Sequence, residues 1–135
     1  MTSGEPQYSV TVRRELIAQH FLVGGDCGRE NKLNSHRYRI EARYEGTSLD
    51  QHGFLLDIDE IHRKLDGLVE RYRDRTLNEL PEFDGLNPSV ENFSRILSDR
   101  LVVGAPNVHA LEVTVWEDAD ASAAYRRPLG DKLRG

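Results

Sequence analysis

Residues 35–46 read SHRYRIEARYEG, and apolar and charged side chains alternate along most of this stretch. Its even positions are apolar or aromatic apart from His36 at the start, whereas its odd positions from 37 to 43 are arginine or glutamate. Side chains on a β-strand point to opposite faces at every second residue. The pattern therefore predicts a strand with one buried face and one solvated face.

Two further stretches repeat this arrangement and also end their apolar stripe with a polar side chain. Tyr8–Phe21 carries an apolar stripe that ends at His20, and Leu111–Glu117 carries one that ends at Glu117. The strand period places His20, His36 and Glu117 on the buried faces of their strands. A polar group at such a margin needs a partner, a metal or a ligand, because an unsatisfied buried polar group is costly. The three stretches together predict a pocket.

Two helices are predicted between the second and third stretches. Asp57 and Glu60 form a capping-box-like start, and apolar residues at helical spacing continue the helix to about Arg75. Asn87-Pro88 is a typical helix start, and the second helix is expected to end near Gly104. The inner faces of the two helices are formed by Ile58, Ile61, Leu65, Leu68 and Tyr72, and by Val90, Phe93, Leu97 and Leu101.

After the second helix we expect a strand over Val108–Trp116 and a short polar helix or turn around Ala119–Tyr125. Residues 1–7 and 126–135 are interpreted as loose tails of a single domain spanning residues 1–135. Two strands, two helices and one or two further strands predict an α+β fold, with helices on one face of an antiparallel sheet. Such a small sheet has open edges, so we also expect a homo-oligomer that covers them.

Composition excludes several classes of partner. The net charge is -5 at pH 7, whereas nucleic-acid binders normally carry a basic stripe, so we expect no nucleic-acid partner. No apolar run is long enough to cross a bilayer, so no membrane partner is expected. Cys27 is the single cysteine, which leaves no internal disulfide and fits a reducing compartment such as the cytoplasm.

Two motifs carry a resemblance to a known family. Residues 86–92 read LNPSVEN, and residues 113–117 read VTVWE. With Gly53–Asp57 and the Asp74-Arg75 segment, they resemble the 6-pyruvoyltetrahydropterin synthase / 6-carboxytetrahydropterin synthase family of the T-fold. The resemblance implies a four-stranded antiparallel sheet with two helices on one face in the order ββααββ. It further implies barrels closed by oligomerisation, a hexamer, and a pterin ligand.

The resemblance also implies a zinc site, and one of its three histidines is missing here. Leu16–His20 is similar to the strand with the family's first zinc histidine, and Asn34-Ser35-His36 stands where the family has His-Gly-His. A neutral amide oxygen is a poor donor for zinc, so Asn34 leaves two strong ligands. We expect His20 and His36 to be remnants of the site, with no tightly held zinc and no other cofactor. The alternative is that zinc is retained through His20, His36 and a substitute such as Asn34 or Glu30.

The candidate catalytic residues are Cys27, Asp74 and Arg75. Arg75 stands where the family has a proton-transferring histidine, but arginine stays protonated above pH 12 and cannot relay a proton. Its guanidinium suits an anion clamp instead. Cys27 precedes Asn34 roughly as the family's nucleophile does, and Glu30 lies closer to the motif. The structural alternative for Cys27 is a free thiol in a glycine-rich loop, and the alternative for Arg75 is a surface charge network.

The recognition half of the site is retained in the sequence. Glu117 corresponds to the glutamate that holds the pterin ring, and we expect Ser89, Glu91 and His36 to add ligand contacts. We therefore predict a homologue that binds a pterin-like or purine-like small molecule at a subunit interface without performing the standard zinc-dependent synthase reaction. The alternatives are a non-catalytic binder or scaffold, and a zinc-retaining pterin lyase.

Overall fold

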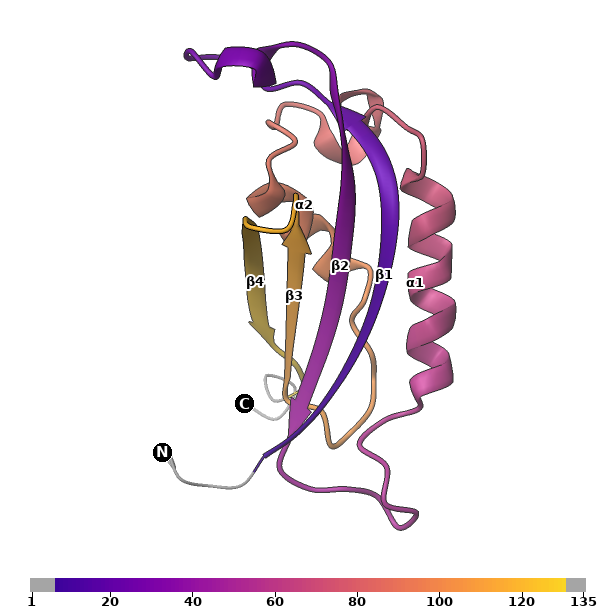
Figure 1. The fold of residues 1–135 in the computed structure, drawn as a ribbon. Helices are drawn as coiled ribbons and strands as arrows, with labels where there is room; N and C mark the ends of the chain where they lie inside the picture. The colour runs from indigo at the N-terminus through magenta and orange to yellow at the C-terminus, as the bar shows by residue number, and fades with distance from the viewer. Residues whose placement is uncertain (1–6, 131–135) are drawn as a thin grey trace.

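The computed structural model describes residues 7–130, which form one four-stranded antiparallel sheet with both helices against one of its faces (Figure 1). The strands occur in the sheet in chain order, so each strand pairs with its neighbour in sequence. This architecture confirms the predicted α+β fold. The main elements are β1 (Tyr8–His20), β2 (Asn34–Gly46), α1 (Ile58–Tyr72), α2 (Val90–Asp99), β3 (Ala110–Trp116) and β4 (Ser122–Pro128).

The alternating stretch at residues 35–46 lies within β2, one of the two central strands of the sheet. Its even apolar side chains form the core-facing row, with Tyr38, Ile40 and Tyr44 each at most 1% exposed. The register pairs Ala18 with His36 and Ile40 with Val115, so the apolar rows of β1, β2 and β3 coincide on one face. Strand periodicity alone therefore predicted the buried face.

The two helices cover different parts of that face. Helix α1 packs against β1, and α2 packs against β3 and β4 (Figure 1). The side chain of Asp57 accepts a hydrogen bond from the Asp59 N–H, which caps α1 as the sequence predicted. Phe93 of α2 joins the layers, because its ring centroid lies 5.3 Å from those of both Tyr38 and Tyr72.

Both helices end earlier than predicted. Helix α1 stops at Tyr72 rather than near Arg75, because Asp74 adopts a left-handed φ of 61° and its N–H donates to the Ile17 carbonyl at 2.7 Å. The chain then follows the edge of β1 instead of continuing the helix. Helix α2 stops at Asp99 rather than near Gly104, because the Arg100 N–H closes its last turn onto Leu97 and Ser98 carbonyls.

The prediction for the C-terminal region was wrong. Residues 122–128 form the strand β4, where we expected a short helix or turn followed by a tail from residue 126. The strand has no apolar stripe because none of its side chains is buried. Backbone pairing with β3 holds it in the sheet, and ion pairs of Arg126 with Glu45 at 2.8 Å and of Arg127 with Asp99 of α2 add to this. Residues 1–6 and 131–135 of the predicted tails lie outside the described residues.

None of the helices in residues 7–130 is both long enough and apolar enough to span a membrane.

Candidate functional site

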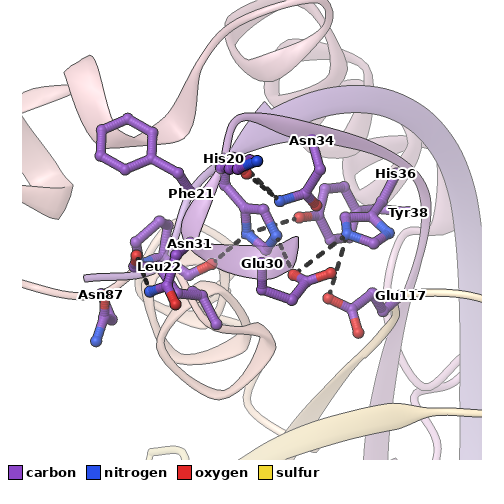
Figure 2. Close-up of polar contacts among 12 residues, drawn as sticks. His20, Phe21, Leu22, Glu30, Asn31, Asn34, His36, Tyr38, Asn87 and Glu117 are labelled. Atoms are coloured by element: carbon purple, nitrogen blue, oxygen red, sulfur yellow. Dashed lines mark hydrogen bonds and ion pairs between the residues drawn. The ribbon is translucent and has the colours of Figure 1, made fainter. Parts of the chain in front are cut away.

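Four ionisable side chains meet at one end of the sheet (Figure 2). His20 ends β1, His36 is the third residue of β2, and Glu117 directly follows β3. Glu30 comes from a short 3-10 helix, Gly28–Asn31, in the loop between β1 and β2. One ligand atom from each of the four lies within 4.8 Å of those from the other three.

Glu30 is the centre of this group, which we call the His-Glu cluster (His20, Glu30, His36 and Glu117). Its Oε1 atom lies 3.0 Å from His20 Nε2 and 3.7 Å from His36 Nε2. The same His36 nitrogen lies 3.5 Å from Glu117 Oε2. The strand phase therefore brings together His20, His36 and Glu117 as predicted, and the loop adds a second carboxylate.

The backbone fixes the orientation of the His20 ring. His20 is 1% exposed, and its Nδ1 atom lies 2.8 Å from the carbonyl oxygen of Pro88. A carbonyl oxygen only accepts, so Nδ1 carries a hydrogen, and Nε2 is the nitrogen that faces Glu30. The Tyr38 hydroxyl lies 3.2 Å from the same Nδ1. Burial, with smaller contributions from Glu117 and Glu30, raises the pKa of the Tyr38 hydroxyl well above its usual value.

Two asparagines hold Pro88 in this position. Asn78 exchanges hydrogen bonds with the Phe21 backbone at 2.9 and 2.8 Å. Asn87 exchanges hydrogen bonds with the Val23 backbone at 2.7 and 3.0 Å. Each amide side chain bonds both the N–H and the C=O of one backbone residue, as a neighbouring β-strand does. These bonds connect the chain after β1 to the segment before α2. The Asn-Pro sequence thus has a structural role in addition to starting a helix.

Two buried polar atoms at the start of β2 have no hydrogen-bond partner among the described residues, namely His36 Nε2 and Asn34 Oδ1. The Asn34 amide nitrogen donates to the His20 carbonyl at 3.2 Å and to the Lys32 carbonyl at 2.7 Å. Buried polar atoms are normally paired, so these exceptions indicate that a donor or a cation belongs in the site.

The residues present fit a divalent metal ion. The expectation of no tight zinc was based on two strong donors, His20 and His36, whereas the structure places the Glu30 carboxylate beside both. Two histidines with one glutamate form one of the ligand sets of catalytic zinc sites. The sequence alone left open whether Glu30 substitutes for the missing histidine, because loop geometry decides whether its carboxylate reaches the other two. The expectation of no tightly held zinc stays a prediction.

The three candidate catalytic residues lie outside the His-Glu cluster. Cys27 is half-buried, and its thiol contacts the Gly24 carbonyl at 3.6 Å. Asp74 and Arg75 are exposed and follow the edge of β1, where the Gln19 N–H donates to the Arg75 carbonyl. Within one chain, these residues are not brought together with the histidines.

Two further residues expected to contact a ligand lie at the start of α2. Ser89 caps the helix, because its hydroxyl oxygen accepts a hydrogen bond from the Asn92 N–H at 3.1 Å. Glu91 is exposed in the first turn. The observed capping role of Ser89 is structural, and ligand contacts of Ser89 and Glu91 stay predictions.

An open cavity of about 380 Å³ lies beside Glu117 and His36. Arg37, Arg39 and Trp116 also line it, although their side chains project from the sheet face opposite the core. Arg39 lies over the Trp116 ring at 5.5 Å, and the indole nitrogen is buried without a partner. The alternation in residues 35–46 predicts only a solvated face for these arginines, because it does not reveal where a strand end becomes concave.

Comparison with known proteins identifies a family and a shared fold. A family model described as 6-pyruvoyl tetrahydropterin synthase matches residues 9–128. Dihydroneopterin monophosphate aldolase of Pyrococcus furiosus is 26% identical over 87 residues, which cover 64% of this chain and 71% of that protein.

Two solved structures of 6-pyruvoyl tetrahydropterin synthases share the fold. The Caenorhabditis elegans protein has a TM-score of 0.76 at 15% identity, covering 90% of this chain and 96% of its own. The Plasmodium vivax protein has a TM-score of 0.77 at 14% identity, covering 92% and 99% respectively. The expected four-stranded T-fold architecture of the single chain is thereby confirmed.

Proposed function

This chain belongs to the 6-pyruvoyl tetrahydropterin synthase family, and from that premise we propose that it binds a pterin-like or purine-like small molecule through Glu117. A pterin or guanine ring presents adjacent N–H donors on its amino-pyrimidine edge. A carboxylate accepts two such hydrogen bonds in parallel, and charge-assisted bonds of this kind are short and strong. His36 lies next to Glu117 and is the second residue we assign to ligand contact.

The observation that carries this proposal is the position of the Glu117 carboxylate. It extends the buried row of β3 beyond Val115, yet its side chain keeps 25% of its surface exposed beside the cavity. A fully solvated surface glutamate would not continue a buried row of side chains or lie 3.5 Å from a buried histidine nitrogen. A heterocycle that enters the cavity would find the carboxylate desolvated on one side and accessible on the other.

We assign the site to a subunit interface of a homo-oligomer, with a hexamer as the expected state. The outer edge of β4 has no strand partner within residues 7–130, and open edges favour association. Asp74 and Arg75 lie along the β1 edge, where a neighbouring copy would receive them. This placement supports a site that one chain completes for another. The single cysteine supports a cytoplasmic location within the same proposal.

The proposal excludes the standard synthase reaction. Arg75 replaces the family's proton-transferring histidine and stays charged, so it cannot relay a proton but suits an anionic substituent. Cys27 lies outside the His-Glu cluster, where no described side chain activates its thiol. The two outcomes compatible with this reading are an altered reaction on a related heterocycle and binding without turnover.

A lyase reaction on a phosphorylated dihydropterin is the second candidate function. The specific support is the similarity to dihydroneopterin monophosphate aldolase over 87 residues. Arg37 and Arg39 line the cavity beside Glu117 and would suit a phosphate group. Incubating the protein with dihydroneopterin monophosphate and following the pterin product by chromatography tests this function, and absence of product would favour a binder.

Binding is tested by titrating the protein with dihydroneopterin in a calorimeter. Replacing Glu117→Gln keeps the size of the side chain but removes its charge and one acceptor, so we expect Kd to rise about 10- to 100-fold. Glu79→Gln is the matched control, because the Glu79 side chain is exposed and makes no hydrogen bond or ion pair with another described side chain. Unchanged affinity in Glu117→Gln would show that the carboxylate is not the anchor.

A further inference from the structure

We propose that His20, His36 and Glu30 bind a divalent transition-metal cation, with Glu30 in place of the missing third histidine. Zinc is the best match, because imidazole nitrogens and a carboxylate oxygen suit this borderline-soft ion. The inference concerns the pocket of the proposed function, but it rests only on the chain's own side chains. It is tested on metal alone, without any pterin.

His20 turns one fixed nitrogen toward the site. Because Nδ1 donates to the Pro88 carbonyl, Nε2 is the nitrogen that faces a carboxylate oxygen of Glu30, 3.0 Å away. A ring nitrogen and a carboxylate oxygen at this distance need a positive charge between them, either a proton or a metal cation. A backbone carbonyl that holds the far nitrogen of a histidine ring is also the usual way in which a metal-binding histidine is oriented.

Two carboxylates face the same nitrogen of His36. Its Nε2 atom is buried without a hydrogen bond, and it faces Glu30 at 3.7 Å and Glu117 at 3.5 Å. Bonds of 2.0–2.1 Å at tetrahedral angles place zinc ligand atoms roughly 3.3 Å apart. The two contacts of Glu30 with histidine nitrogens, 3.0 and 3.7 Å, fall on either side of that spacing. The three donors therefore need only small movements to share one ion.

Hydrogen bonds in the loop between β1 and β2 hold Glu30 in position. The Glu30 carbonyl accepts a hydrogen bond from the Leu22 N–H at 2.7 Å, and the Glu30 N–H donates to the Cys27 carbonyl at 3.1 Å. Asn31 adds a bond from its side chain to the Leu22 carbonyl at 3.0 Å. Glu30 is thus fastened on both sides to the chain that leaves β1.

Asn34 is not the third ligand in this arrangement. Its amide nitrogen is used by two backbone carbonyls, so the side chain braces the ends of β1 and β2. Glu117 stays available for the heterocycle, and three protein ligands leave one position open. A bound zinc ion of this kind supplies a Lewis acid and activates water. The competing explanation is a proton shared between His20 and Glu30.

The experiment measures metal content. Tag-free protein is stripped with a chelator, reloaded with zinc chloride, desalted and analysed by inductively coupled plasma mass spectrometry. We expect about one zinc per chain for the wild type and for the control Glu79→Gln. Second-shell changes typically cost 10- to 100-fold in metal affinity, so loss of a ligand in Glu30→Gln should cost at least about 100-fold.

A rescue variant separates ligation from folding. Asn34 pairs with His20 in the register, so Asn34→His in the Glu30→Gln background would place an imidazole at the same end of the sheet. We expect this double variant to recover zinc, and cobalt-loaded wild type to show the intense visible absorption of a four-coordinate site. Zinc content at trace level in reloaded wild type, or equal zinc affinity in Glu30→Gln, would overturn the proposal.

Failure of this inference is distinguishable from failure of the proposed function. Glu117→Gln should keep its zinc and lose dihydroneopterin affinity. If zinc is absent while dihydroneopterin binds through Glu117, the metal inference fails alone. If zinc is bound but Glu117→Gln leaves dihydroneopterin affinity unchanged, only the proposed function fails.

Discussion

Glu82 ties the segment that supports the site to both helices, and its charge should control stability in acid. One carboxylate oxygen accepts a hydrogen bond from Arg71 Nη2 at 2.5 Å, and the other accepts bonds from Arg71 Nε at 2.6 Å and the Tyr72 hydroxyl at 2.5 Å. Arg100, which caps α2, lies 3.5 Å away. The bonds from Arg71 are the main cause that lowers the pKa of the Glu82 carboxyl to about 2.

The magnitude follows from linkage between protonation and folding. A shift from 4.5 to about 2 corresponds to about 3 kcal/mol at 1.36 kcal/mol per unit. Arg71 is 36% exposed, so solvent screening reduces the expected value to about 2 kcal/mol. Because the folded-state pKa is the lower one, this stability is fully present above pH 4.5 and is lost as the pH falls toward 2.

The assay is urea unfolding of wild type and Glu82→Gln, followed by circular dichroism at several pH values between 7 and 3. We expect Glu82→Gln to be less stable by about 2 kcal/mol at pH 7, with the difference shrinking steadily below pH 4.5. Glu79→Gln should match the wild type throughout. A difference that is absent at pH 7, or that keeps its size down to pH 3, would refute the reasoning.

Two further predictions concern packing. A Cβ at Gly46 would lie 2.0 Å from the Asn107 carbonyl oxygen, so Gly46→Ala should destabilise the fold by more than about 2 kcal/mol. A Cβ at Gly67 in α1 meets no atom within 4 Å, so Gly67→Ala should stabilise the fold by about 0.5–1 kcal/mol. Equal urea midpoints for the two variants would contradict this. Phe93 is fully buried between both helices and the sheet, so Phe93→Ala should cost about 3–5 kcal/mol in the same measurement, and a cost under 1 kcal/mol would contradict the packing described.

Sequence reasoning predicted the sheet face that forms the core, because burial on one face imposes period-two alternation. His20, His36 and Glu117 were found by that rule, since each continues an apolar row. The alternation in β2 predicts which face it shares with β1 and β3, but not the register, because a slip of two residues would keep the same side chains on the buried face. Here local pattern and tertiary structure obey the same constraint.

The rule fails where tertiary contacts replace the pattern. Strand β4 pairs with β3 through its backbone and has no buried side chain, so its sequence resembles a loop. Asp74 ends α1 through its contact with β1, which the helical periodicity before it does not reveal. Glu30 reaches the histidines only because backbone hydrogen bonds fold the β1–β2 loop back. Long-range contacts decide all three cases.

The most direct test of the account is a crystal structure of zinc-loaded protein soaked with dihydroneopterin, with diffraction data collected at the zinc absorption edge. We predict one anomalous peak per chain, bonded to His20 Nε2, His36 Nε2 and a Glu30 oxygen, with the heterocycle held by Glu117 in the adjoining cavity. A map without that peak, with Glu30 turned to solvent and the ligand bound elsewhere, would contradict it.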